Sequence, residues 1–237
     1  MRLAGGIGGL RGVPIGLAFG VRARHAEPMP APASEPGSAP DFYVALGASG
    51  PQGLDDIQRV LACLPRGLPA AVLICLHRPF DRMSHLQEIL NRHSPLPIHL
   101  AQDGERLLSG HGYVGEPDAH LALAAQGACA LLADPGNLHR NRTIDALFRS
   151  IAAHAPGRFI GVVLSGALDD GARGLAAIHA AGGVTMVLTP RPEAERGMPE
   201  NAIRHDGPID FIGSPEAIAA EIVERVRAAT SAIGQPG

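Results

Sequence analysis

Hydrophobic and polar positions follow two distinct rhythms along the chain from Asp41 onward. Short, continuous apolar runs indicate buried strands, and apolar residues that recur every three or four positions indicate amphipathic helices. The pattern predicts strands over residues 42–46, 70–76, 97–101, 159–164, 184–188 and 209–212, and helices over residues 54–64, 82–93, 143–155 and 171–181 and after Ser214. Strands that alternate with helices through short links are typical of an α/β fold with a doubly wound, mostly parallel sheet and helices on both faces.

The rhythm changes before the helix predicted over residues 143–155. Residues 112–115 and 121–133 have the pattern of short strands, and Gln126-Gly127 supplies a turn. A small antiparallel hairpin is therefore expected as an excursion from the parallel sheet. The last helix has a clear start, because Ser214 suits the N-cap position and Pro215 suits the first helical position.

The first forty residues differ in composition from the rest of the chain. They are rich in Gly at first and in Pro, Ala, Ser and Glu later, and Arg11 and Pro14 interrupt their apolar run too early for a secretory signal. Such a segment cannot bury enough apolar surface to offset the entropy of ordering it. We therefore expect a disordered tail over 1–40, a folded domain over 41–232 and a short tail over 233–237.

Composition narrows the classes of function. The formal net charge is −3 without a dense run of basic residues, so nucleic acid is not an expected partner. No stretch approaches the roughly 20 apolar residues of a membrane span, and the scattered histidines lack the spacing of a metal site. Neither membrane insertion nor a metal or organic cofactor is expected.

Cys63, Cys75 and Cys129 form no C-x-x-C pair and indicate buried, reduced thiols in a cytoplasmic protein. The oligomeric state stays open.

Polar residues follow three of the predicted strands. The first strand runs into Ser49, the second runs into His77, and the strand over 159–164 is followed by a loop that contains Asp170. The carboxyl ends of parallel strands share one edge of a doubly wound sheet, where ligands bind. Serine, histidine and aspartate are the nucleophile, base and orienting acid of acyl transfer, so the pattern predicts a triad at this edge.

Each of these residues also has a simpler interpretation. Ser49 and Asp170 each stand where a helix N-cap is expected, His77 could be a buried histidine of the core, and Asp169 competes with Asp170 as the acid. The joint occurrence at three strand ends favours the triad. Pro51 breaks the G-x-S-x-G pattern of the nucleophile elbow, and the order Ser, His, Asp differs from that of the α/β-hydrolases, so a different hydrolase design is expected.

The chain from about Tyr43 to the last helix resembles the catalytic domain of bacterial chemotaxis protein-glutamate methylesterases. The similarity lies in the order and spacing of several short segments. They are Gly47-Ala48-Ser49, His77-Arg78-Pro79, Asp103-Gly104-Glu105-Arg106, Gly110-His111-Gly112-Tyr113-Val114, Pro117-Asp118-Ala119-His120, His139-Arg140, Asp145-Ala146-Leu147-Phe148-Arg149-Ser150, Leu164-Ser165-Gly166, Asp169-Asp170-Gly171-Ala172-Arg173-Gly174 and Gly197-Met198-Pro199.

The resemblance implies that Ser49 is the nucleophile, His77 the base and Asp170 the acid. It further implies hydrolysis of glutamate methyl esters on chemoreceptor signalling helices, with deamidation of receptor glutamines as a second activity. The backbone N–H groups near Gly50 and Ala167 are candidates for an oxyanion hole.

The sequence departs from the family at two places near these residues. The loop Gly50-Pro51-Gln52-Gly53 is one residue longer than usual, and Ala167 stands where the family often has Met. The family's usual amino-terminal receiver domain is also not expected within the first forty residues, which implies a stand-alone catalytic domain. The competing hypothesis is a catalytically impaired relative, with a drifted serine loop, that acts as a binding or regulatory module.

Overall fold

The computed structural model describes residues 38–77, 85–115, 119–134, 142–155, 158–191, 197–205 and 207–233. Several predicted features lie outside these residues: most of the expected tail, the start of the helix predicted over 82–93, and the motif residues Arg78-Pro79, Pro117-Asp118 and His139-Arg140. Of the expected tail, Ser38 accepts a hydrogen bond from the Ser109 N–H, and Pro40 is buried.

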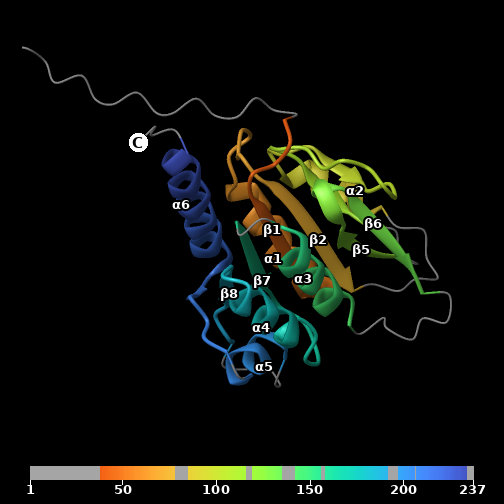
Figure 1. Cartoon of the computed structure of the whole chain (residues 1–237). Helices are drawn as coiled ribbons and strands as arrows, with labels where there is room; N and C mark the ends of the chain where they lie inside the picture. Colours follow the sequence, from red (N-terminus) through yellow and green to blue (C-terminus); the bar gives the residue numbers. More distant parts are fainter. Residues whose placement is uncertain are drawn as a thin grey trace, which may run out of the picture. The chain divides into compact units, whose positions relative to one another are not determined.

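The described residues form a seven-stranded parallel sheet, in which the apolar runs of the sequence are the strands (Figure 1). In chain order the strands are β1 (Tyr43–Ser49), β2 (Ala71–His77), β3 (Ile98–Leu100), β4 (Gly112–Val114), β7 (Phe159–Val163), β8 (Val184–Leu188) and β9 (Phe211–Gly213). Their order in space is β3-β4-β2-β1-β7-β8-β9. Strand β1 therefore lies inside the sheet, between β2 and β7, and the direction in which successive strands are added reverses there.

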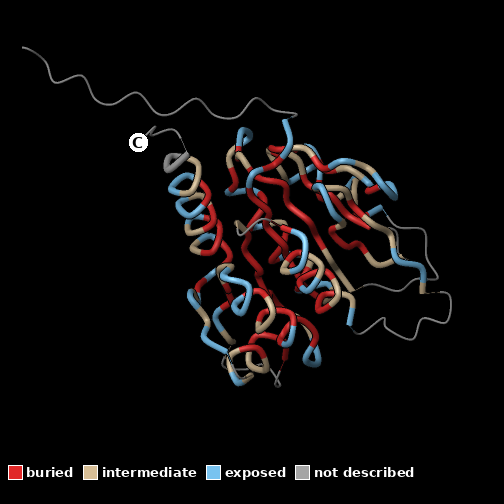
Figure 2. The backbone as a smooth tube through the Cα atoms, viewed as in Figure 1, coloured by how far each residue is buried: buried red, intermediate tan, exposed pale blue. Residues whose placement is uncertain are grey.

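Helices cover both faces of the sheet, and each face has its own hydrophobic core. The helices are α1 (Gly50–Cys63), α2 (Leu86–His93), α3 (Thr143–His154), α4 (Ala172–Ala180), α5 (Met198–Arg204) and α6 (Pro215–Ile233). Helices α1, α2 and α6 pack on one face, and α3, α4 and α5 pack on the other. Figure 2 shows the strands as buried and the helices as buried on one side only. The predicted doubly wound α/β fold is confirmed.

The predicted hairpin is also confirmed, but it is smaller than expected. Strands β5 (Ala119–Leu123) and β6 (Cys129–Ala133) pair antiparallel around a 3₁₀ turn at Ala125–Gly127. Residues 112–114, which we grouped with this excursion, belong to the main sheet instead, because β4 pairs parallel with both β2 and β3. A run of three residues, all buried, has no alternation that would assign it to either sheet.

Two smaller expectations have different outcomes. The Ser214 hydroxyl accepts a hydrogen bond from the Ala217 N–H at 3.3 Å, so the predicted cap of α6 is confirmed.

The expected burial of all three cysteines is wrong for Cys63, which is exposed at the end of α1. Its neighbours Val60, Leu61 and Leu64 occupy the buried side, and helical spacing turns position 63 outward. None of these three cysteines, all within the described residues, forms a disulfide bond.

Candidate active site

The three predicted strand exits meet at one edge of the sheet. Ser49 and His77 end the adjacent strands β1 and β2 and are direct register partners. On the other side of β1, strand β7 ends at Val163 and leads into the loop 164–171, which contains Asp170. This edge lies where the strand order reverses, the usual ligand position of doubly wound sheets. The fold thus brings Ser49, His77 and Asp170 to the same edge.

His77 and Asp170 lie in close contact. The His77 Nε2 atom is 2.7 Å from Asp170 Oδ2, and the side chains are 13% and 0% exposed. The contact has the distance of an ion pair but not the alignment of a hydrogen bond, because the ring N–H does not point at the oxygen. A buried carboxylate beside an imidazole is the arrangement that stabilises an imidazolium ion.

The Asp170 carboxylate is held by the amino-terminal end of α3. Its Oδ2 atom accepts a hydrogen bond from the Ile144 N–H and its Oδ1 atom from the Asp145 N–H, both at 2.9 Å. Two donors fix the orientation of the carboxylate, and a helix amino terminus is a favourable place for negative charge. The simpler interpretation of Asp170 as the cap of the helix that follows it is wrong, since Gly171 holds that position. Asp169, the competing acid, is exposed.

Ser49 ends β1 and precedes the first residue of α1, as the cap interpretation assumed, but its side chain makes no capping hydrogen bond. Its backbone N–H donates to the Ser165 carbonyl at 2.9 Å, which ties the end of β1 to the exit of β7. The two segments approach so closely that a Cβ atom on Gly166 would lie 2.7 Å from Ser49 Cβ. The half-buried Ser49 hydroxyl is thus placed by backbone contacts and left available for chemistry.

The two oxyanion candidates belong to the two segments that meet at Ser49, the start of α1 and the loop after β7. Gly50 is the first residue of α1, with a φ of +71°, and the N–H groups of a first helical turn have no partner within the helix. Ala167 is exposed and forms an isolated antiparallel bridge with Gly197. Residues 50–53, which we treated as an enlarged loop, form the first turn of α1, where Pro51 is tolerated.

Two buried carboxylates near this edge were not predicted as site residues. Asp56 of α1 is fully buried, accepts a hydrogen bond from the Ser165 N–H at 3.3 Å, and binds Arg191 Nη2 at 3.1 Å. Asp145 of α3 is 3% exposed and accepts N–H groups of the β7–α4 segment. Both were detectable in principle, because each acid falls on the apolar face of its helix, beside Ile57 and Phe148 respectively.

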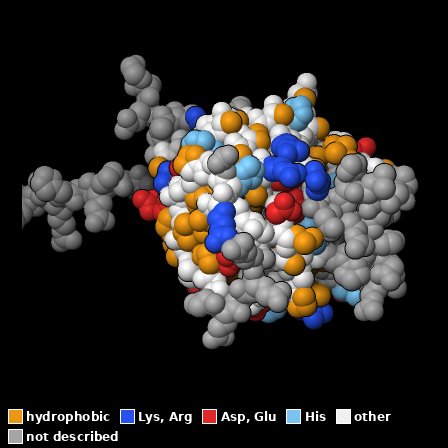
Figure 3. Space-filling view, turned by 90° about the horizontal axis from the view of Figure 1, so that it is seen from below, with side chains coloured by type: hydrophobic (Ala, Val, Ile, Leu, Met, Phe, Trp, Pro, Cys, Tyr) orange, Lys and Arg blue, Asp and Glu red, His pale blue; other side chains and the backbone are white. Residues whose placement is uncertain are grey.

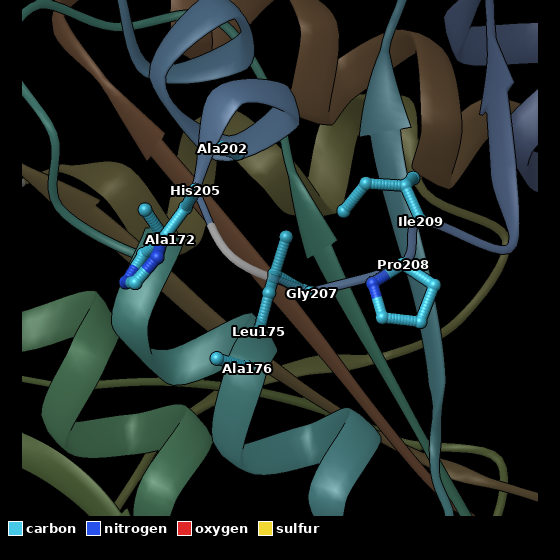
Figure 4. Close-up of a pocket in the computed structure, with 8 residues that line it drawn as sticks. All are labelled: Ala172, Leu175, Ala176, Ala202, His205, Gly207, Pro208 and Ile209. Atoms are coloured by element: carbon cyan, nitrogen blue, oxygen red, sulfur yellow. The ribbon is translucent and has the colours of Figure 1, made fainter.

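The described residues contain no group of three or more side chains suited to hold a metal ion. A small recess lies between α4, α5 and the segment Gly207–Ile209, with His205 beside Ala172 (Figure 4). Its cavity volume of about 10 Å³ is at the lower limit for one water molecule, and its lining includes none of Ser49, His77 and Asp170. The recess is therefore not a substrate site.

Basic side chains gather on the face that carries the strand ends. Figure 1 shows the arrowhead of β2 pointing down, and Figure 3 views the molecule from below, where Arg side chains cluster beside an acidic group. Arg142, just before α3, and Arg173, in the first turn of α4, are exposed and form no ion pair with a described residue. Both are close in sequence to the groups that surround Asp170.

This fold and this edge define a class of protein, namely an α/β protein with a serine, a histidine and an aspartate gathered where its strand order reverses. The chain belongs to the CheB methylesterase family, since its residues 44–222 match the model of that family. None of the described helices has the length and apolar character needed to cross a membrane.

Curated relatives and a solved structure agree with this assignment. The chain is 37% identical over 195 residues to the protein-glutamate methylesterase/protein-glutamine glutaminase of Salmonella choleraesuis (strain SC-B67), covering 78% of this chain and 55% of the relative. It is 38% identical over 172 residues to the protein of the same name from Yersinia pestis bv. Antiqua (strain Antiqua), covering 71% and 49%. The chain thus spans about half the length of these relatives. The crystal structure of the Thermotoga maritima CheB methylesterase catalytic domain matches with a TM-score of 0.68 and 26% identity, over 77% of this chain and 97% of that one.

Proposed function

We propose that this chain hydrolyses the γ-methyl esters of glutamate side chains on chemoreceptors, with Ser49 as nucleophile, His77 as general base and Asp170 as orienting acid. The observation that carries the proposal is the His77–Asp170 contact of 2.7 Å at the strand end that pairs with Ser49. The names of the relatives support the reaction, since they are protein-glutamate methylesterases of the same family.

In the first half of the reaction the Ser49 oxygen attacks the ester carbonyl carbon. His77 accepts the hydroxyl proton, and because its Nε2 atom lies beside Asp170, Nδ1 is the ring nitrogen that takes this proton. The oxyanion that forms is stabilised by the N–H groups of Gly50 and Ala167. The C–O bond to the methoxy group then breaks, His77 protonates the leaving oxygen, and methanol departs from a glutamyl-serine ester.

In the second half a water molecule replaces methanol. His77 removes a proton from the water as it attacks the acyl carbon, and the same proton returns to the Ser49 oxygen when that bond breaks. The products are the free glutamate carboxylate and the regenerated serine. A glutamine amide would follow the same route with ammonia as the leaving group, which is the second activity named for the relatives.

The surroundings of the site fit a protein substrate that carries negative charge. Arg142 and Arg173 are exposed and unpaired among the described residues, so they are available to a segment in which carboxylates flank the ester. This supports methylated chemoreceptor helices as the partner. Three cysteines without a disulfide bond fit a reducing compartment, and a cytoplasmic location is part of the proposal.

The test is methanol release from a methylated receptor cytoplasmic fragment by the purified chain. Ser49→Ala should remove this release and the labelling by a fluorophosphonate, which reacts with activated serines. Ser94→Ala, at the end of α2, is the matched control and should change neither. A wild-type chain that neither releases methanol nor becomes labelled would instead support the competing hypothesis of a binding or regulatory module.

A further inference from the structure

Asp145 is a buried carboxylate that has no role in the proposed reaction steps. It opens the segment 145–150 that carries part of the family resemblance, and only 3% of the residue is exposed. Its Oδ1 atom accepts hydrogen bonds from the Gly171 N–H at 3.1 Å and from the Gly174 N–H at 2.7 Å. Gly171 is the residue directly after Asp170, so Asp145 binds the backbone at the point where the catalytic acid is attached.

The two aspartates cap each other's helices. Asp170, from the loop before α4, accepts two N–H groups in the first turn of α3, while Asp145, in the first turn of α3, accepts two N–H groups at the start of α4. The residues at the regular cap positions, Arg142 and Gly171, make no side-chain cap hydrogen bond. Each helix start thus depends on the carboxylate of the other segment.

Helices α3 and α4 approach each other closely at this point. A Cβ atom on Gly174 would lie 2.7 Å from Phe148 Cβ and 3.1 Å from Asp145 Cα, so the two helices touch through their backbones. Without the Asp145 oxygen, the Gly171 and Gly174 N–H groups would be buried without a partner. The least costly relief is a shift of the 170–174 backbone, which would carry Asp170 away from His77.

We propose that Asp145 is a positioning residue of the active site, which holds the Asp170 carboxylate against His77 through the Gly171 and Gly174 N–H groups. The role in catalysis rests on the proposed function, whereas the role in placing Asp170 does not. Asp145 touches neither His77 nor Ser49 by any hydrogen bond in the described part of the chain, so it acts through Asp170.

The hydrogen bonds, rather than the charge, are the means of positioning. Burial raises the pKa of Asp145, and the neighbouring Asp170 charge raises it further, while the Gly174 N–H and Arg149 oppose the change. A negative charge is thus costly at this position. One oxygen accepts both N–H groups, and an asparagine retains such an oxygen without the charge.

The experiment compares Asp145→Ala with Asp145→Asn. Asp145→Ala should lower kcat for methanol release about 100-fold, the effect of a displacement near 1 Å, with KM changed less than about threefold. Asp145→Asn should restore kcat to within about tenfold of the wild type, because its oxygen still accepts both N–H groups. Asp145→Ser, which keeps a shorter acceptor, replaces Asp145→Ala if that variant does not fold.

The matched control is Ser150→Ala on the same helix. The Ser150 hydroxyl accepts the Leu123 N–H and donates to the Leu147 carbonyl, so its loss destabilises α3 without touching the β7–α4 segment. It should lower the melting temperature but leave kcat within about twofold. Equal losses of kcat in Ser150→Ala and Asp145→Ala would overturn the proposal, as would Asp145→Asn being as inactive as Asp145→Ala.

A structural readout separates this proposal from the proposed function. In a crystal structure of the Asp145→Ala or Asp145→Ser variant, the distance from His77 Nε2 to Asp170 Oδ2 should be clearly longer than the 2.7 Å of the parent chain. An unchanged distance would refute the positioning role even if the enzyme is active. A longer distance would support it even if the wild-type chain released no methanol.

Discussion

Two groups of histidines in this molecule differ in what lies beside the ring. At the strand ends, His77 lies 2.7 Å from the Asp170 carboxylate. In the edge strand β3 and just before the adjacent strand β4, His99 and His111 lie against each other, with ring centroids 4.9 Å apart and planes 14° from parallel. Each group contains buried ring nitrogens without a hydrogen-bond partner among the described residues.

The groups around a histidine ring determine whether its protonated form is favoured. Burial lowers the pKa of His111, the positive charge of a protonated His99 lowers it further, and only Glu105 acts in the other direction. The His99–His111 pair, with Tyr113 against the His99 ring, is therefore a packed group of rings in which a positive charge on His111 is unfavourable. His77 instead lies beside the Asp170 carboxylate. The same residue type thus has a carboxylate as its neighbour in one place, where we propose chemistry, and a second imidazole in the other.

The largest expected effect comes from His77→Ala. Loss of the base should lower kcat by on the order of 10⁶, as in other triads. The melting temperature should change little, because Asp170 keeps its two N–H donors without the imidazole. Methanol release and thermal unfolding are the two measurements. A variant with substantial activity would mean that His77 is a structural residue like His99 and His111.

The acid beside the ring is the next point to test. Asp170→Asn should lower kcat by about 10⁴, because an amide favours the wrong imidazole tautomer. The neighbouring Asp169→Asn is the control, and its exposed side chain should tolerate the change with little loss. The opposite ranking, measured by methanol release, would show that the wrong aspartate had been assigned.

The lowered pKa of His111 predicts a dependence of stability on pH. The folded protein lowers the pKa of His111, so the unfolded chain binds a proton more readily. The stability should therefore be complete above about pH 6.5 and should fall as the pH decreases from there toward the folded pKa. His111→Phe, which keeps a ring but cannot titrate, should flatten the melting temperature between about pH 6.5 and 5 and leave methanol release at neutral pH unchanged. An equally steep profile in the variant would contradict this.

The smallest predicted effect is on the melting temperature and comes from backbone strain at the edge that carries the candidate site. Leu168, in the loop before Asp170, has a φ of +72° and is 55% exposed, and its carbonyl accepts a hydrogen bond from Asn201 Nδ2 at 2.6 Å. Leu168→Gly should remove about 1 kcal/mol of left-handed strain and raise the melting temperature by about 2–4 °C. Leu132→Gly, at an exposed position of β6, should lower it. If both variants move in the same direction, Leu168 is not strained.

The sequence was sufficient for the edge that carries the candidate chemistry, because Ser49 and His77 stand at the ends of apolar runs and Asp170 lies in the loop after a third run. The parallel direction of these runs fixes the edge at which they end. It was not sufficient for β4, a run of three buried residues without a period. Helix α5 escaped prediction because only seven residues form it and Pro199 stands in its first turn.

The supporting carboxylates were missed for another reason. Asp56 and Asp145 stand on apolar helix faces, where a sequence pattern alone treats an acid as an exception rather than as a partner. Their partners are backbone N–H groups more than twenty residues away, and only the folded chain identifies them. Long-range backbone partners of this kind leave no trace in local spacing.

The order of strands in the sheet has a consequence for the order in which the candidate active site forms during synthesis. Strand β2 follows β1 after a single helix, whereas β7 pairs with β1 only after the chain has passed Phe159. Because closing a longer loop costs more entropy, we expect β1 and β2 to associate first during synthesis. A nascent chain would then align Ser49 with His77 while Asp170 is still unfolded or not yet made. Asp170, the proposed acid, would join them last, when β7 docks, so a partly synthesised chain would not yet hold the complete proposed triad.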